Sequence, residues 1–159
     1  NLIENFYKAG FATEHIMDNV NKVMSYKSGE NFSAVDVVVF DLDSARADFV
    51  KKGGTPSVIK KSNYTQVIEG NELPVGVLET SKSKIVNYYL NSGDVVVLAS
   101  DGVFDAFKTS DNFAGFINNI PAINMQEFSK NILNQAIKLN RGQVYDDMTV
   151  MAIKVILNR

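Results

Sequence analysis

The chain contains no cysteine and only one histidine, His15. The first absence excludes a cysteine nucleophile, a thiolate zinc site and a disulfide. The single histidine means that any serine–histidine mechanism would depend on His15 alone. His15 falls beside the polar side of a predicted helix, where we expect it to be solvated. Any chemistry must therefore use carboxylates, hydroxyls, lysines or a metal ion held by oxygen ligands.

Long apolar runs, a basic block and a secretion signal are also missing. No stretch approaches the ~18 consecutive apolar residues needed to span a membrane, and residues 1–10 mix charged with apolar residues, unlike a signal peptide. With 16 Lys+Arg against 18 Asp+Glu, the net charge of −2 argues against a nucleic-acid partner. We expect a cytoplasmic segment without nucleic-acid or membrane contact. Because residue 1 is Asn, we also expect a longer parent chain, which could carry a membrane anchor.

The 159 residues suffice for one domain, and the 45% that are hydrophobic supply a core without a structural metal. Apolar spacing predicts a helix over residues 2–9 and a second from Thr13 to about residue 27. The apolar stripe expected on the second helix is Ile16, Met17, Val20, Val23 and Met24. This opening helical pair is followed by a β-rich middle.

Strands are predicted over residues 35–42, 46–51, 57–60, 64–68, 85–90 and 94–100, with 73–78 as a compact loop or short strand. Helices are predicted around residues 113–117 and over 125–139, and a final strand over 148–157. Pro121 ends the first of these helices. This order describes an α+β domain with a mostly antiparallel sheet.

Two acidic motifs stand at strand ends. A buried strand runs directly into Asp101-Gly102, which places a rigidly held carboxylate beside a glycine that permits close backbone approach. Asp146-Asp147 precede the final strand, and adjacent buried carboxylates are costly unless a cation such as Mg²⁺ or Mn²⁺ offsets their charge. Simpler interpretations stay open, because Asp-Gly is a common hairpin turn and Asp146-Asp147 could be solvated loop residues.

A third acidic motif, Asp41-Leu42-Asp43, resembles the nucleophile motif of haloacid-dehalogenase-type phosphatases. In those enzymes a short loop and a helix follow, whereas here the pattern at residues 46–51 predicts a strand. The pattern therefore favours a polar hairpin turn. Asp36 is a lone acid in an apolar strand, either buried and hydrogen-bonded or simply the strand start.

One combination of motifs is specific. Ser100-Asp101-Gly102-Val103-Phe104-Asp105, followed about forty residues later by Asp146-Asp147-Met148-Thr149-Val150, resembles the metal-dependent serine/threonine phosphatases of type 2C (the PPM family). The branch around stage II sporulation protein E is the most similar. Its pattern also resembles the segments 27–36, 53–57, 73–78 and 90–94 of this chain, so the resemblance runs nearly end to end.

The resemblance implies an antiparallel β-sandwich flanked by helix pairs, with metals bound at one end. By position, Asp101 and Asp146 would be metal ligands. Gly102, Asp147 and Asp36 would support these ligands from outside the ligand set. The family's first metal motifs precede its first helix, so residues 1–159 are expected to be the C-terminal portion of a domain truncated at its N-terminus.

The implied activity is hydrolysis of phosphoserine or phosphothreonine in proteins, with two Mn²⁺ or Mg²⁺ ions activating water for direct attack on phosphorus. The implied substrate is a phosphorylated anti-anti-sigma-type regulator in sporulation or stress signalling, and a dimer would form through the opening helices. With half of the two-metal site missing, we expect weak or no metal binding and no turnover by this segment alone. A non-catalytic interaction domain of the same fold is the alternative.

Overall fold

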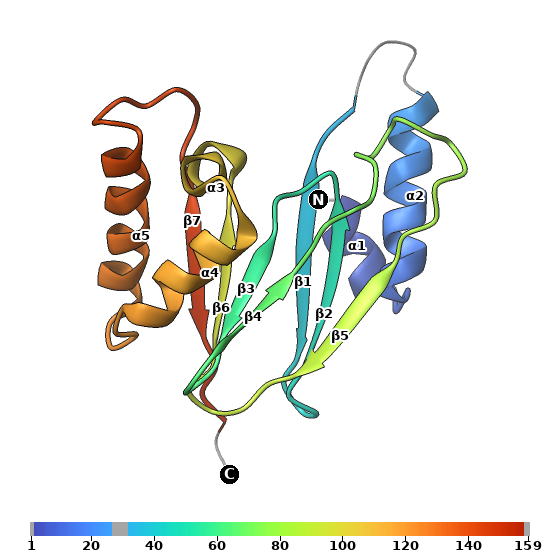
Figure 1. The fold of residues 1–159 in the computed structure, drawn as a ribbon. Coiled ribbons are helices and arrows are strands. Elements are labelled where there is room, and N and C mark those ends of the chain that lie inside the picture. The colour runs from blue at the N-terminus through green and yellow to red at the C-terminus, as the bar shows by residue number, and fades with distance from the viewer. Residues whose placement is uncertain (1, 27–31, 158–159) are drawn as a thin grey trace. The chain divides into compact units, whose positions relative to one another are not determined.

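The computed structural model describes residues 2–26 and 32–157, which form two compact units interleaved along the chain (Figure 1). Each unit contains one antiparallel sheet and its own helices. The predicted α+β class is confirmed. Membership of residues 1–159 in one domain stays a prediction. Within the described ranges, no helix is both long and apolar enough to cross a membrane.

The first unit comprises Asn1–Gly54 and Gly70–Tyr89. Its elements are α1 (Leu2–Lys8), α2 (Thr13–Tyr26), β1 (Val35–Asp41), β2 (Arg46–Lys52) and β5 (Ile85–Tyr89). The strand order is β1-β2-β5, with antiparallel neighbours. Met17 of α2 packs with the buried Val50 and Val75. The predicted end of the second helix, at residues 27–29, lies outside the described residues.

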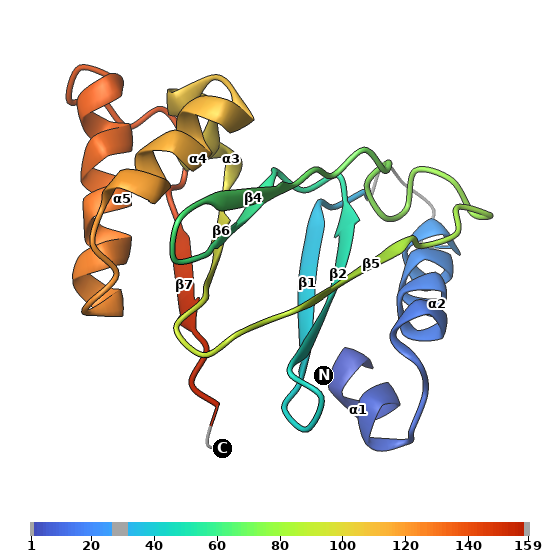
Figure 2. The ribbon, with the colours of Figure 1, turned by 60° about the horizontal axis from the view of Figure 1, so that its bottom comes forward.

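The second unit comprises Thr55–Glu69 and Leu90–Arg159. Its strands are β3 (Ser57–Lys60), β4 (Thr65–Ile68), β6 (Val95–Ala99) and β7 (Val150–Lys154), and its helices are α3 (Asp101–Phe107), α4 (Ser110–Asn119) and α5 (Met125–Leu139). The strand order is β4-β3-β6-β7, again antiparallel throughout. The three helices lie on one face of this sheet (Figures 1 and 2).

The core of the second unit joins that sheet face to the helices. Val95 and Val97 of β6 are buried together with Phe113 of α4 and Phe128 of α5. β-branched residues suit the pleated sheet, and the aromatic rings fill the space between the layers. This packing holds β6 rigidly, including the end at which the Asp101-Gly102 motif begins.

Helix α2 differs from its predicted apolar stripe. Ile16 and Met17 are buried as expected, but Val23 is 44% exposed and Asn21 is only 1% exposed. The Asn21 side chain donates hydrogen bonds to the carbonyls of Leu78 (2.7 Å) and Glu79 (3.2 Å) and accepts one from the Gly76 N–H (3.0 Å). A buried amide is tolerated because the loop satisfies both its donor and its acceptor.

Asn21 holds the segment 73–78, for which the sequence predicts a compact loop or a short strand. The structure makes it a loop, with a single antiparallel bridge between Ser33 and Val75. Next to this loop lies the fully buried Lys52, whose Nζ contacts Glu72 Oε2 at 2.7 Å and donates to Ser81 Oγ at 2.9 Å. Partners of this kind are required for a buried ammonium group.

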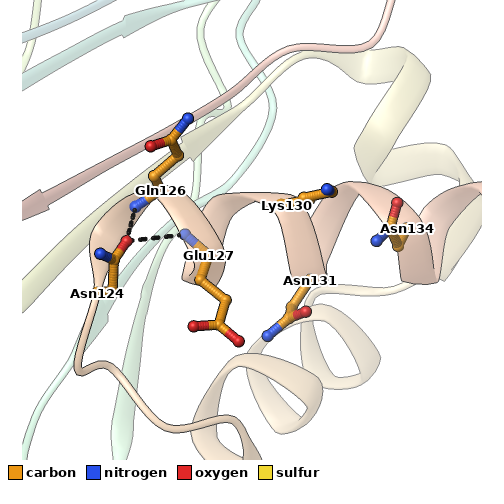
Figure 3. A pocket seen from close by; sticks show the side chains of 6 residues that line it. All are labelled: Asn124, Gln126, Glu127, Lys130, Asn131 and Asn134. Atoms are coloured by element: carbon orange, nitrogen blue, oxygen red, sulfur yellow. Dashed lines mark hydrogen bonds between the residues drawn. The ribbon is translucent and has the colours of Figure 1, made fainter.

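Asn124 provides a direct test of how α5 begins. Its Oδ1 accepts hydrogen bonds from the N–H groups of Gln126 (3.0 Å) and Glu127 (3.1 Å), two of the first unpaired donors of the helix (Figure 3). Because an alanine leaves these donors uncapped, Asn124→Ala should lower the free energy of unfolding by about 1 kcal/mol. Urea denaturation measures this change.

The matched control for the cap is Gln126→Ala. Gln126 is exposed, and its side chain makes no hydrogen bond to a described residue. Its replacement should change the free energy of unfolding by less than about 0.5 kcal/mol. Equal losses in the two variants would contradict the capping role of Asn124.

Candidate metal centre

The pairing of β6 with β7 brings the two acidic motifs to the same end of a sheet. The register runs from Val95 opposite Lys154 to Ala99 opposite Val150. Residues that follow Ala99 must therefore lie beside residues that precede Val150. Figure 1 shows this end of the sheet, where α3 starts directly after β6 and the loop from α5 enters β7.

Ser100 makes the contact between the two segments. Its backbone N–H donates to the Thr149 carbonyl (3.0 Å), and its hydroxyl donates to the Asp147 carbonyl (2.9 Å) and accepts from the Thr149 N–H (2.9 Å). Gly102 completes the contact, because a Cβ atom there would lie 2.6 Å from the Asp147 carbonyl oxygen. The structure thus brings Asp101 and Gly102 together with Asp146 and Asp147.

The carboxylates of Asp101 and Asp146 are exposed and similarly held. Asp101 Oδ1 accepts from the Gly102 N–H at 2.9 Å, and Asp146 Oδ1 accepts from the Asp147 N–H at 2.7 Å. Neither carboxylate, nor that of Asp147, forms an ion pair with any residue that the structure describes. Because no cationic side chain pairs with them, these carboxylates can accept a cation.

The donor chemistry fits a hard divalent cation in part. Carboxylate oxygens are the ligands that Mg²⁺ and Mn²⁺ prefer. Across residues 2–26 and 32–157, however, no three His, Cys, Asp or Glu side chains gather as a metal-binding group. This segment therefore offers two candidate protein ligands, and the other positions around an octahedral cation would be left to water or to other groups.

Asp36 lies on β1, in the first unit, and is described apart from the other candidates. Its Oδ2 accepts from Lys51 Nζ at 2.5 Å, and the side chains of both residues are largely buried. Of the two predicted interpretations, the structure supports the buried, hydrogen-bonded acid. Its supporting role at a metal centre stays a prediction.

Asp41 is part of a hairpin turn. Its Oδ2 accepts from the Ser44 hydroxyl (2.7 Å), and its Oδ1 accepts from the Asp43 N–H (3.1 Å). Hydrogen bonds from Ser44 lower the pKa of the Asp41 carboxyl. Because the antiparallel strand β2 follows rather than a helix, the dehalogenase-type interpretation is wrong.

The turn interpretation of Asp101-Gly102 is also wrong, because α3 begins at Asp101. The predicted elements include no helix at residues 101–107 and so give no special position to Ser100 before it. The signal was present, since a serine that precedes an acid and an apolar pair is typical of a helix start. The residues that Ser100 contacts could not be predicted from the sequence, because they lie far along the chain.

A separate pocket of about 550 Å³ lies along α5 (Figure 3). Its lining comprises Asn124, Gln126, Glu127, Lys130, Asn131 and Asn134. These residues belong to the start and middle of α5, whereas Asp146 follows the end of that helix. No predicted site residue lines this pocket, so it is not the candidate metal centre.

Comparisons with known proteins define the class. The chain is similar to a solved structure of the PP2C phosphatase domain and a fragment of the regulatory domain of SpoIIE from Bacillus subtilis, with a TM-score of 0.87 and 26% identity. The match covers 97% of this chain and 47% of that one. The predicted type 2C-like fold is thereby confirmed.

The family follows from the sequence match. The family model for stage II sporulation protein E (SpoIIE) matches residues 1–156, and the chain belongs to this family. Stage II sporulation protein E of Bacillus subtilis (strain 168) is 28% identical over 163 residues, covering 97% of this chain and 19% of that protein. Phosphoserine phosphatase RsbU of the same organism is 23% identical, covering 92% of this chain and 46% of that protein. The chain spans less than half the length of these curated relatives.

The close approach at Gly102 leads to a prediction. An alanine Cβ would lie 2.6 Å from the Asp147 carbonyl oxygen, so the loop or the start of α3 must shift. Gly102→Ala should lower the free energy of unfolding by about 1–3 kcal/mol, the usual cost of overpacking. Chemical denaturation measures the loss.

Gly115 in α4 offers the matched control, since an added Cβ there meets nothing within 4 Å. Gly115→Ala should raise the free energy of unfolding by about 0.5–1 kcal/mol, because alanine is the better helix former. A Gly102→Ala variant as stable as the unsubstituted chain would show that the loop does not lie against α3.

Proposed function

We propose that this chain is the C-terminal, metal-binding portion of a phosphatase domain that removes phosphate from serine or threonine of a protein substrate. The observation that carries the proposal is the meeting of Asp101 with Asp146 and Asp147 at one end of β6 and β7. Membership in the SpoIIE family and the PP2C-like fold support the same assignment.

In this proposal Asp101 and Asp146 hold Mn²⁺ or Mg²⁺, with two ions in the intact domain. When bound, such a cation lowers the pKa of a water and neutralises charge on the phosphoryl group. The chain's own residues prepare the ligands. Each carboxylate is oriented by one backbone N–H, from Gly102 and Asp147 respectively, and keeps its second oxygen available.

Two solved structures of the same fold were prepared with a divalent metal. A phosphatase domain of SpoIIE from Bacillus subtilis was presoaked with Mn and is similar to this chain with a TM-score of 0.75. RsbX, solved in complex with magnesium, is similar with a TM-score of 0.68. At 24% and 14% identity these likenesses show the fold alone, and the metal itself belongs to the proposal.

The proposed substrate is a phosphorylated anti-anti-sigma-type protein, and the proposed setting is sigma-factor regulation in the cytoplasm. The name of RsbU, a phosphoserine phosphatase, supports the substrate chemistry. A structure of the RsbU and RsbW domains of Rv1364c from Mycobacterium tuberculosis is similar to this chain with a TM-score of 0.83 and shares its fold. A dimer would use α1 and α2.

The second candidate function is a non-catalytic interaction domain of the same fold. It is favoured by the same structural fact that limits the first, namely that the described residues offer no group of three metal ligands. The two candidates differ in whether a longer protein that contains this chain releases phosphate.

Turnover by the 159-residue chain alone is the first test. Because two carboxylates complete only part of a metal site, we expect no Mn²⁺-dependent release of phosphate from a phosphoserine peptide. A colorimetric phosphate assay across a range of Mn²⁺ concentrations measures this. The longer parent protein is the positive control, and hydrolysis by the short chain would disprove the partial-site assignment.

Asp101→Ala in the longer parent protein tests the ligand assignment. Removal of a ligand should cost more than the ~10–100-fold typical of groups that only support ligands, so we expect loss of measurable phosphatase activity. Asp111→Ala is the control, since Asp111 is an exposed acid in the first turn of α4. Full activity in Asp101→Ala would refute the assignment, and an inactive parent protein would favour the non-catalytic candidate.

A further inference from the structure

Ser100 stands at the N-cap position of α3, but its side chain makes no capping hydrogen bond. Its backbone has the extended conformation of an N-cap residue, with φ −70° and ψ 163°. A serine in this position ordinarily accepts a hydrogen bond from the second or third N–H of the helix. The side chains of Thr109 and Asn124 do this for α4 and α5.

The start of α3 is satisfied in another way. The Ser100 carbonyl accepts from the N–H groups of Val103 (3.1 Å) and Phe104 (3.0 Å). The Gly102 N–H is taken by Asp101 Oδ1. The Ser100 hydroxyl is thereby left available for a contact outside its own helix.

That contact is the loop before β7. The hydroxyl acts as donor and acceptor at once, giving its hydrogen to the Asp147 carbonyl and receiving the N–H of Thr149, each at 2.9 Å. These two backbone groups lie on either side of Met148, so both bonds fix the course of the loop just after Asp146. An alanine at residue 100 would leave both groups without this partner.

Ser100 is itself held on the side of the sheet. The Thr55 hydroxyl donates to the carbonyl of Ala99 at 2.5 Å, and Ala99 pairs with Val150. Ser100 therefore stands between a fixed strand end and the loop, and the absence of a side chain at Gly102 lets the loop approach. The loop position is set relative to Asp101, the next residue.

We propose that Ser100 is a positioning residue, whose hydroxyl sets the position of Asp146 relative to Asp101. The metal-binding part of this inference rests on the function proposed above. Metal ligands must be held within about 0.5 Å of their productive geometry, and groups that orient ligands typically change metal affinity by ~10–100-fold when removed. Ser100 fills this role with a side chain that a helix cap would otherwise use.

Three substitutions separate positioning from capping. Ser100→Ala removes the hydroxyl, Ser100→Thr keeps it, and Ser100→Asn supplies a strong N-cap residue without a hydroxyl. In the 159-residue chain, hydrogen exchange of the Thr149 N–H should accelerate about tenfold or more in the alanine and asparagine variants, as expected for loss of its acceptor. The threonine variant should retain slow exchange.

Thr109→Ala is the matched control, because it removes a true cap, that of α4, and should leave Thr149 exchange unchanged. In the longer parent protein, the Mn²⁺ concentration for half-maximal activity should rise ~10–100-fold for Ser100→Ala and Ser100→Asn. It should stay near the original value for Ser100→Thr. If Ser100→Asn preserved both the slow Thr149 exchange and the original Mn²⁺ requirement as well as Ser100→Thr does, the proposal would be overturned in favour of a capping role.

The two readouts also separate this inference from the proposed function. An altered Thr149 exchange with an unaltered Mn²⁺ requirement would overturn the positioning role and leave the phosphatase assignment intact. Full phosphatase activity in the Asp101→Ala variant of the parent protein would instead refute the proposed function, whatever the exchange rate of the Thr149 N–H.

Discussion

The antiparallel pairing of β6 with β7 is the interaction on which the candidate site depends. In the chain Asp146 follows Asp101 by 45 residues, and the register that sets Ala99 opposite Val150 brings the two motifs to the same end of the sheet. Val95 and Val97 of β6 are buried against the three helices, so the strand end that leads to Ser100 and Asp101 cannot move without disturbing a packed core. The packed apolar layer thereby fixes the position of the exposed acidic residues that follow the strand, as a site for a small cation requires.

Two opposing demands meet at the start of α3. The acidic loop must lie close to Asp101, yet like charges repel and helix starts need hydrogen-bond acceptors. Gly102 removes the steric obstacle, and the Ser100 hydroxyl provides both a donor and an acceptor to the loop backbone. The remaining negative charge is not balanced by any described side chain. A divalent cation would supply this balance, which is the physical link between the local geometry and the proposed phosphatase chemistry.

Much of the fold follows from patterns that are local in the chain. β-branched runs predict β1 and β6, helical spacing predicts α5 with its observed bounds, and the polar turn at Asp41 predicts the β1–β2 hairpin. One difference from the prediction occurs where a distant partner overrides the local preference. Asn21 is buried because loop backbone groups far along the chain satisfy its amide, and Val23 becomes exposed on the same helix. Helix α3 was missed because Asp-Gly is also a common turn signal.

The sequence by itself determined the kind of chemistry available. The absence of cysteine and the single histidine leave carboxylates, hydroxyls, lysines or a metal ion held by oxygen, and the motifs predict Asp101 and Asp146 as metal ligands. Tertiary structure decided which of the predicted residues meet and what holds them. Asp101, Gly102, Asp146 and Asp147 come together because strand register acts over long sequence separations, whereas Asp36 is engaged by Lys51 in the other unit. The role proposed for Ser100 could come only from the tertiary structure. The local sequence does not tell whether a serine hydroxyl bonds the backbone of its own helix or that of a distant loop.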